Sequence, residues 1–186
     1  MEVGEAVRTL RATRCFSHRE VPLANLARWL NDARWCGSSR NSQPWRFIVV
    51  RSPTTRKALA GLGDDALHLA LAPVVVALAA VEGRYPQSGL FDMGRVAQSV
   101  MVSAHADGVG SCIAAFEPAE NIAEARRLLG VPGSMHLDWA LSLGYPAIRP
   151  DAPTEMAVGG GSPPGRMPMS AVVFWERFGE VSAPTR

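Results

Sequence analysis

Segments with helical spacing and segments with strand spacing alternate along this chain, and glycine, proline or small polar residues separate them. The helical spacing is clearest over 23–36. There, one face carries apolar residues at intervals of three and four: Leu23, Leu26, Ala27, Leu30 and Ala33. Gly37 follows in the position of a helix-ending glycine. An alternation of this kind restricts the fold to the α/β or the α+β class.

The same reading assigns the remaining elements. We expect helices over residues 3–12, 23–36, 53–62, 92–107 and 118–129, with a further short helical turn at 66–72. We expect strands over 45–51, 110–116 and 136–144, whereas 74–81 fits a strand or, by pattern alone, a buried helix. Asp92 is the expected N-cap of its helix, after a turn-rich connection. The connections leave open whether the sheet is parallel.

The length of 186 residues fits one domain, spanning 1–186, with an irregular segment at 150–165 and an apolar C-terminal docking segment at 168–178. A formal net charge of +2 is too small to attract nucleic acid. The apolar run 69–81 contains a proline and falls short of the ~20 residues of a membrane-spanning helix. The N-terminal residues 1–14 include acidic side chains and no apolar core before a cleavage site, so we expect no signal peptide there. We therefore expect a cytoplasmic protein without nucleic-acid or membrane partners.

Cysteine and histidine patterns give no indication of a metal site. The 3 cysteines are far apart and form no CxxC pair, which argues against a disulfide framework or a zinc knuckle. The 4 histidines are scattered without HExxH spacing. We expect the histidines to be surface or satisfied polar residues, Cys112 to be a small buried residue, and the tryptophans to be mostly core or interface anchors.

The common nucleotide and nucleophile motifs are missing: there is no phosphate-binding loop, no GxSxG elbow, and no GxGxxG between a strand and a helix. Arginines and small polar groups remain, in separate places. Arg11 and Arg14 are three residues apart at an expected helix end, 38–43 (SSRNSQ) is a loop rich in hydrogen-bonding groups, and Arg166 follows the long irregular segment. Such a set suits a ligand with an anionic end and a heteroaromatic end. For the two N-terminal arginines, surface pairing with Glu2 or Glu5 is the alternative.

These motifs, in this order, resemble the FMN-dependent nitroreductase family over about residues 6–177. The SSxNxQPW stretch that begins at Ser38 is the most specific part. The others are RATRCF from Arg11, DxGxxxQ from Asp92, GVGSCIAAF from Gly108, LLGVP from Leu128, GYP from Gly144 and RMP from Arg166.

The resemblance implies an α+β fold with a central, mainly antiparallel sheet flanked by helices, in an intertwined homodimer with two FMN sites at the subunit interface. Arg11, Arg14 and Arg166 would hold the phosphate and ribityl chain, beside Ala12, where the family usually has Ser. Ser38, Ser39, Asn41 and Gln43 would come from the partner subunit. The backbone at Ile113, Ala114 and Ala115 would face the flavin near N5. The short connection before Asp92 predicts an open pocket lined by Tyr85 and Phe91.

The implied activity is NAD(P)H-driven reduction of nitroaromatic, quinone or flavin-type acceptors by ping-pong hydride transfer. The chemistry belongs to the cofactor, so no catalytic side chain is expected, and Asp92 and Gln98 are interpreted as structural. The sequence does not distinguish NADH from NADPH. Two alternatives stay open: a flavin-dependent dehydrogenase or oxidase of an organic substrate, and a flavin-binding protein without turnover.

Overall fold

The computed structural model describes residues 1–81, 86–147 and 166–180, and its centre is a four-stranded sheet in the order β1-β2-β4-β3. The strands are β1 (Trp45–Val50), β2 (Val74–Val81), β3 (Gly110–Ala115) and β4 (Met135–Gly144). Each neighbouring pair is antiparallel. The strand direction that the residue pattern left open is therefore antiparallel, as the family resemblance implied, and the fold is α+β.

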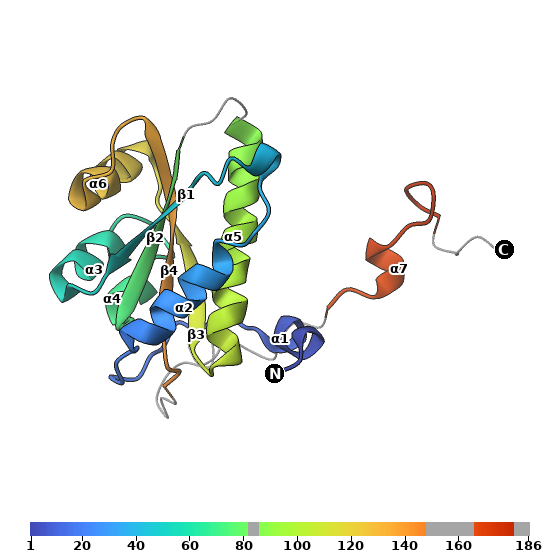
Figure 1. Ribbon diagram of the computed structural model, residues 1–186, viewed down its shortest axis with the longest axis horizontal. Helices are drawn as coiled ribbons and strands as arrows, with labels where there is room; N and C mark the ends of the chain where they lie inside the picture. Colours follow the sequence, from blue (N-terminus) through green and yellow to red (C-terminus); the bar gives the residue numbers. More distant parts are fainter. Residues whose placement is uncertain (82–85, 148–165, 181–186) are drawn as a thin grey trace.

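Two layers of helices cover the sheet, one on each face (Figure 1). On one face, α2 (Leu23–Ala33) and α5 (Pro86–Ala106) pack over a core that includes Trp29, Val96 and Leu141. The opposite face carries α3 (Pro53–Ala60), α4 (His68–Leu71) and α6 (Ala119–Leu129). The core of that face includes Leu59, Leu69 and Phe116.

The central position of β2 explains why its sequence alternates so little. Residues 74–80 are all buried, because β1 and β4 flank the strand and helices cover both of its faces. A strand in this position needs apolar side chains on both sides, and such a run looks the same as a buried helix in sequence. The structure decides this ambiguity in favour of the strand.

Three predicted helix boundaries are wrong. The helix predicted over 23–36 ends at Ala33 with Arg34 as its C-cap, so Gly37 is not the residue that ends it. The first helix, α1 (Val3–Thr9), stops before the arginines, and the chain after it is extended, with an isolated bridge from Ala12 to Ser111. The long helix α5 starts at Pro86 rather than Asp92. Asp92 is therefore an interior helix residue and not an N-cap, and Tyr85 lies outside the described residues. Among the described helices, none has both the length and the apolarity to cross a membrane.

The C-terminal part of the described chain, 166–180, contains the short helix α7 (Met169–Val172) and lies away from the sheet and its helices (Figure 1). Large apolar side chains are exposed on it, including Met169 (73%) and Phe178 (92%). The predicted docking segment 168–178 thus leaves its apolar surface open within this chain. The expected irregular segment 150–165 lies outside the described residues.

Candidate functional site

The outer edge of β3 is where the first predicted site residues meet. Ala12 pairs with Ser111 in a parallel bridge, and the Thr13 N–H donates to the Ser111 carbonyl at 2.8 Å. Gly110 permits this approach, since a Cβ atom at that position would overlap the side chain of Thr13. The Arg11–Arg14 segment is therefore brought next to the strand that carries Ile113, Ala114 and Ala115.

Beyond this bridge, two backbone N–H groups of β3 point away from the sheet. The backbone groups of successive strand residues face opposite sides. Phe116 N–H donates to the Asp138 carbonyl at 2.8 Å, next to β4, whereas the Ser111 carbonyl accepts from Thr13 on the outer side. Because successive residues of β3 alternate between the two sides, the N–H groups of Ile113 and Ala115 face outward, like the Ser111 carbonyl and opposite to the Phe116 N–H. The Ile113 side chain is 45% exposed, so this edge is accessible to a ligand.

The two N-terminal arginines place positive charge beside this edge. Arg11 is exposed, and its Nη1 donates to the carbonyls of Arg8 at 2.7 Å and Leu10 at 2.8 Å. Arg14 is half-buried, and its charge helps to lower the pKa of His68. In the described part of the chain neither arginine forms an ion pair, so the alternative in which they pair with Glu2 or Glu5 is wrong. Both charges remain available to an anion.

The loop 38–43 has a strained backbone. Arg40, Asn41 and Gln43 adopt left-handed conformations with φ of 53°, 56° and 46°. Each of these costs a non-glycine residue roughly 1–2 kcal/mol. Strain of this kind is found preferentially at binding sites, where surrounding contacts maintain it. The side chains of Asn41 and Gln43 are exposed and can therefore reach a ligand outside this chain.

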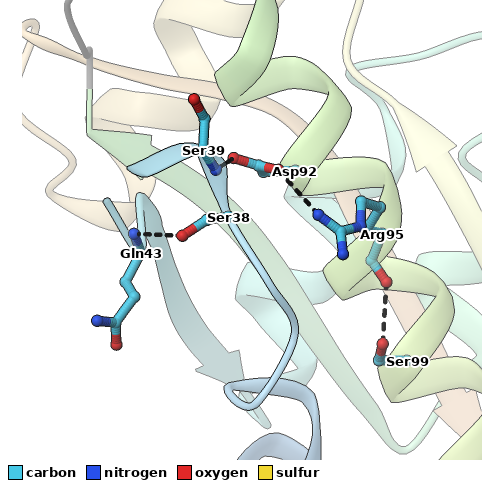
Figure 2. A network of polar contacts seen from close by, with 6 residues as sticks. All are labelled: Ser38, Ser39, Gln43, Asp92, Arg95 and Ser99. Atoms are coloured by element: carbon cyan, nitrogen blue, oxygen red, sulfur yellow. Dashed lines mark hydrogen bonds and ion pairs between the residues drawn. The ribbon is translucent and has the colours of Figure 1, made fainter. Parts of the chain in front are cut away.

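Hydrogen bonds hold the loop against α5 (Figure 2). The carboxylate of Asp92, only 2% exposed, accepts from the Ser39 N–H at 2.9 Å and lies 3.4 Å from Arg95 Nη1. Within the loop, Ser38 Oγ accepts from the Gln43 N–H at 2.9 Å. Ser38 and the Ser39 backbone thus shape the loop, and the Gln43 side chain points away from this network.

The β3 edge and the loop lie at opposite ends of α5 (Figure 1). Near one end of the helix, Asp92 binds the loop; near the other, His105 Nε2 and Thr9 Oγ1 of the N-terminal helix are 2.8 Å apart. His105 follows Asp92 by thirteen positions, which corresponds to about 20 Å along the helix axis. One chain therefore does not bring Arg11 and Arg14 together with Asn41 and Gln43. Arg166 is exposed at the start of the C-terminal segment 166–180.

Sequence reasoning missed a buried polar cluster below β3. His68, expected at the surface or fully satisfied, is 3% exposed; its Nδ1 lies 2.8 Å from Ser142 Oγ and its Nε2 is buried without a hydrogen-bond partner among the described residues. Burial lowers the pKa of His68 to about 4, and the charge of Arg14 adds to this effect. Burial also raises the pKa of the nearby Cys112 thiol. The sequence feature that could have indicated this cluster is Ser142, a hydroxyl between two leucines of a buried strand, which needs a hydrogen-bond partner.

Neither a metal-binding cluster nor the cavity beside α3 involves the predicted cofactor-binding residues that the structure describes. Within the described ranges, no three His, Cys, Asp or Glu side chains come close enough to bind a metal. A cavity of about 430 Å³ lies between the start of α3 and the residues after Cys15, and its polar lining includes His18, Arg51 and Arg56. It contains none of the predicted cofactor-binding residues. The β3 edge is therefore the stronger candidate site.

Comparison with known proteins gives a consistent result. The family model described as "Nitroreductase family" matches residues 7–73. A Methanothermobacter thermautotrophicus protein with the provisional name NADH dehydrogenase/NAD(P)H nitroreductase is 30% identical over 154 residues, which cover 81% of this chain and 80% of the relative. An Archaeoglobus fulgidus protein of the same name is also 30% identical over 154 residues, covering 81% and 88%.

Solved structures share the fold. An FMN-dependent nitroreductase from Clostridium difficile matches with a TM-score of 0.74 at 22% identity, covering 81% of this chain and 91% of its own. A protein from Clostridium acetobutylicum, provisionally named NADH oxidase, matches with a TM-score of 0.78 at 19% identity, covering 93% and 99%. Identities this low establish the common architecture alone.

Proposed function

The chain belongs to the nitroreductase family, and we propose that it is an FMN-dependent NAD(P)H oxidoreductase that reduces nitroaromatic, quinone or flavin-type acceptors. The observation that carries this proposal is the open edge of β3, where the outward N–H groups of Ile113 and Ala115 stand beside the Arg11–Arg14 segment. Relatives whose names include FMN-dependent nitroreductase and NAD(P)H nitroreductase support the cofactor and the electron donor.

The residues at this edge fit FMN chemically. The cofactor has a phosphate at one end and a ring with nitrogen and oxygen acceptors at the other. Arg11 and Arg14 would hold the phosphate, because neither guanidinium is neutralised by an ion pair in the described chain. The backbone at Ile113, Ala114 and Ala115 would face the ring. Ala12 offers no hydroxyl and would act through its backbone, which fixes the arginine segment to Ser111.

A second copy of the chain would complete the site. The loop with Ser38, Ser39, Asn41 and Gln43 contacts α5 at Asp92, about 20 Å along the helix from the contact of His105 with Thr9, which precedes the arginine segment. Its side chains would therefore reach the cofactor of a partner subunit. Exposed apolar side chains support a homodimer: Phe91 on α5 is 70% exposed, and Trp175 on the C-terminal segment is 42% exposed. The same segment would bring Arg166 to a phosphate.

When bound, FMN supplies two-electron redox chemistry, taking a hydride from a reduced nicotinamide and returning electrons to an acceptor. The protein's own groups would bind the cofactor and orient its ring. The outward N–H groups of β3 would orient the ring, and the arginines would offset negative charge. Because no side chain has to move a proton, the lack of a catalytic triad or carboxylate pair agrees with this chemistry. The electron donor and the electron acceptor would bind one after the other at the same face of the flavin ring, which would give ping-pong kinetics.

The absorption spectrum of the purified protein with added FMN, before and after anaerobic NADH or NADPH, tests the proposal. We expect a bound flavin band that bleaches with one of the two nucleotides and returns when a quinone or nitroaromatic is added. Bleaching by an organic donor alone would identify a dehydrogenase or oxidase instead. Bound flavin that no donor bleaches would identify a flavin-binding protein without turnover, and a protein that stays colourless contradicts all three functions.

A further inference from the structure

A chain of buried hydrogen bonds runs from α4 to the backbone of β3. His68 and Ser142 are 3% and 0% exposed, and His68 Nδ1 lies 2.8 Å from Ser142 Oγ. Ser142 Oγ in turn donates to the Cys112 carbonyl at 3.3 Å. Ser142 and Cys112 are register partners on β4 and β3, so their side chains share the sheet face that α4 covers. Most buried polar groups are hydrogen-bonded, and His68 Nδ1 and the Ser142 hydroxyl follow this rule.

The protonation states of His68 and Ser142 determine which group donates and which accepts in each of these hydrogen bonds. Its pKa, lowered to about 4 chiefly by burial and then by Arg14, keeps the ring neutral at pH 7, although Asp65 and the Ile113 carbonyl act in the opposite direction. A neutral imidazole carries one N–H. Ser142 has one hydroxyl proton, which it donates to the Cys112 carbonyl, so the hydrogen bond between the two side chains requires the His68 proton on Nδ1. The other nitrogen, Nε2, is then a buried acceptor that no described residue donates to.

This series of hydrogen bonds ends at the peptide group between Cys112 and Ile113, which includes the Ile113 N–H. In a trans peptide the carbonyl and the following N–H point in opposite directions. The Cys112 carbonyl faces β4 and receives the Ser142 hydroxyl, so the Ile113 N–H faces the open edge. Successive hydrogen bonds polarise one another, and a peptide that accepts at its carbonyl becomes a stronger donor at its N–H. The buried hydrogen bonds of His68 and Ser142 therefore act on the proposed cofactor-binding edge through the Cys112–Ile113 peptide, and neither side chain contacts a ligand.

We propose that His68 and Ser142 are positioning residues for the cofactor-binding edge of β3, which fix and polarise the Cys112–Ile113 peptide and so set how strongly the Ile113 N–H holds the flavin ring. This inference rests on the proposed FMN-dependent function. It assigns a role to a buried imidazole that the redox chemistry does not otherwise use, and it predicts that the two side chains act as one unit.

The experiment compares variants of the full-length protein, with and without added FMN. Ser142→Ala and His68→Leu break the chain, whereas His68→Asn keeps an N–H donor in place of Nδ1. Ser99→Ala is the control, because the Ser99 hydroxyl also donates to a backbone carbonyl, that of Arg95 at 3.0 Å, but this hydrogen bond lies at the exposed surface of α5. The measurements are the amide resonance of Ile113 in isotope-labelled protein, the FMN dissociation constant and the reduction potential of bound FMN.

We expect Ser142→Ala and His68→Leu to move the Ile113 amide resonance in cofactor-free protein, to weaken FMN binding about fivefold and to shift the potential. His68→Asn should keep all three readouts close to those of the wild type, and Ser99→Ala should leave them unchanged. The proposal is overturned if Ser142→Ala leaves the Ile113 resonance in place, if the resonance moves without any change in FMN binding or potential, or if His68→Asn behaves like His68→Leu. Should His68→Leu fail to fold, Ser142→Ala decides the question. Wild-type protein that binds no FMN refutes the proposed function instead, and the Ile113 resonance distinguishes that result.

Discussion

Arg14 is the side chain on which the proposed phosphate contact depends most. It is half-buried beside β3, near enough to His68 for its charge to affect that ring, and forms no ion pair with a described residue. A cation held there without a partner is suited to an incoming anion. The backbone of the same segment, fixed by Thr13 and Ala12, determines where the guanidinium can reach.

Replacing this guanidinium should remove most of the cofactor affinity. For Arg14→Ala we expect FMN to bind about ten- to a hundredfold more weakly, because a charged hydrogen bond contributes roughly 1.5–3 kcal/mol. Flavin fluorescence quenching measures the dissociation constant. Arg34→Ala, on an exposed helix end distant from β3 in sequence and fold, is the control and should bind FMN as wild type does. Equal affinity of Arg14→Ala and wild type would remove Arg14 from the site.

His68 should make the folding stability depend on pH. Its pKa is about 4 in the folded chain and near 6.5 in the unfolded chain, so the unfolded chain binds more protons between these values. The contribution to stability is therefore complete above about pH 6.5 and is lost as the pH falls through 4, by up to about 3 kcal/mol. Chemical denaturation at several pH values measures this. Carboxylates titrate in the same range, so the comparison is with His68→Asn, whose curve should fall less steeply.

Most element types could be predicted from the sequence, because apolar spacing reports burial. Where prediction failed, the deciding contact was distant in sequence. Asp92 carries the features of an N-cap, yet it lies inside α5 because its partner is the Ser39 N–H, which no local pattern reveals. The burial of His68 likewise depends on Ser142, more than seventy residues away. The family motifs identified the candidate residues, but their division between two ends of α5 required the structure.

The contact between the loop and α5 depends on one buried carboxylate. Asp92→Ala leaves the Ser39 N–H and Arg95 without their acceptor, and we expect a loss of about 1–3 kcal/mol in unfolding free energy, with weaker FMN binding. Urea denaturation measures the stability. Asp32→Ala is the matched control, because the side chain of Asp32 is 45% exposed and its pair with Arg28 spans 3.8 Å; a change within about 0.5 kcal/mol is expected. Similar losses for both variants would contradict the anchoring role of Asp92.

The pairing of the N-terminal segment with β3 can be tested through Gly110. A Cβ atom there would overlap the side chain of Thr13, so Gly110→Ala should push the arginine segment off the strand, at a cost of about 1–3 kcal/mol. Thermal unfolding and FMN titration should both report the change. At Gly133 a methyl group would meet no other atom within 4 Å, and Gly133→Ala should leave both unchanged. A Gly110→Ala protein that binds FMN like wild type would separate this pairing from cofactor binding.

At the scale of the whole molecule, the division of predicted residues along α5 leads to a subunit-complementation test. Arg14→Ala and Asn41→Ala should each weaken FMN binding in both sites of a homodimer. In a mixed dimer one site would carry both substitutions and the other would carry neither. Co-expression of the two variants should therefore restore wild-type affinity in about a quarter of all sites. Binding titration of the mixture measures this fraction; recovery of none, with dimers present in sedimentation, would mean that both residues serve the same chain's site.

The outward N–H groups of β3 also matter before any cofactor arrives. Strand edges with unsatisfied donors and an exposed apolar side chain such as Ile113 are templates for pairing with another polypeptide. Ala12 and Thr13 occupy only the beginning of this edge. Binding of the proposed cofactor along this edge would cover these donors, and so it would also protect the strand from pairing with another polypeptide.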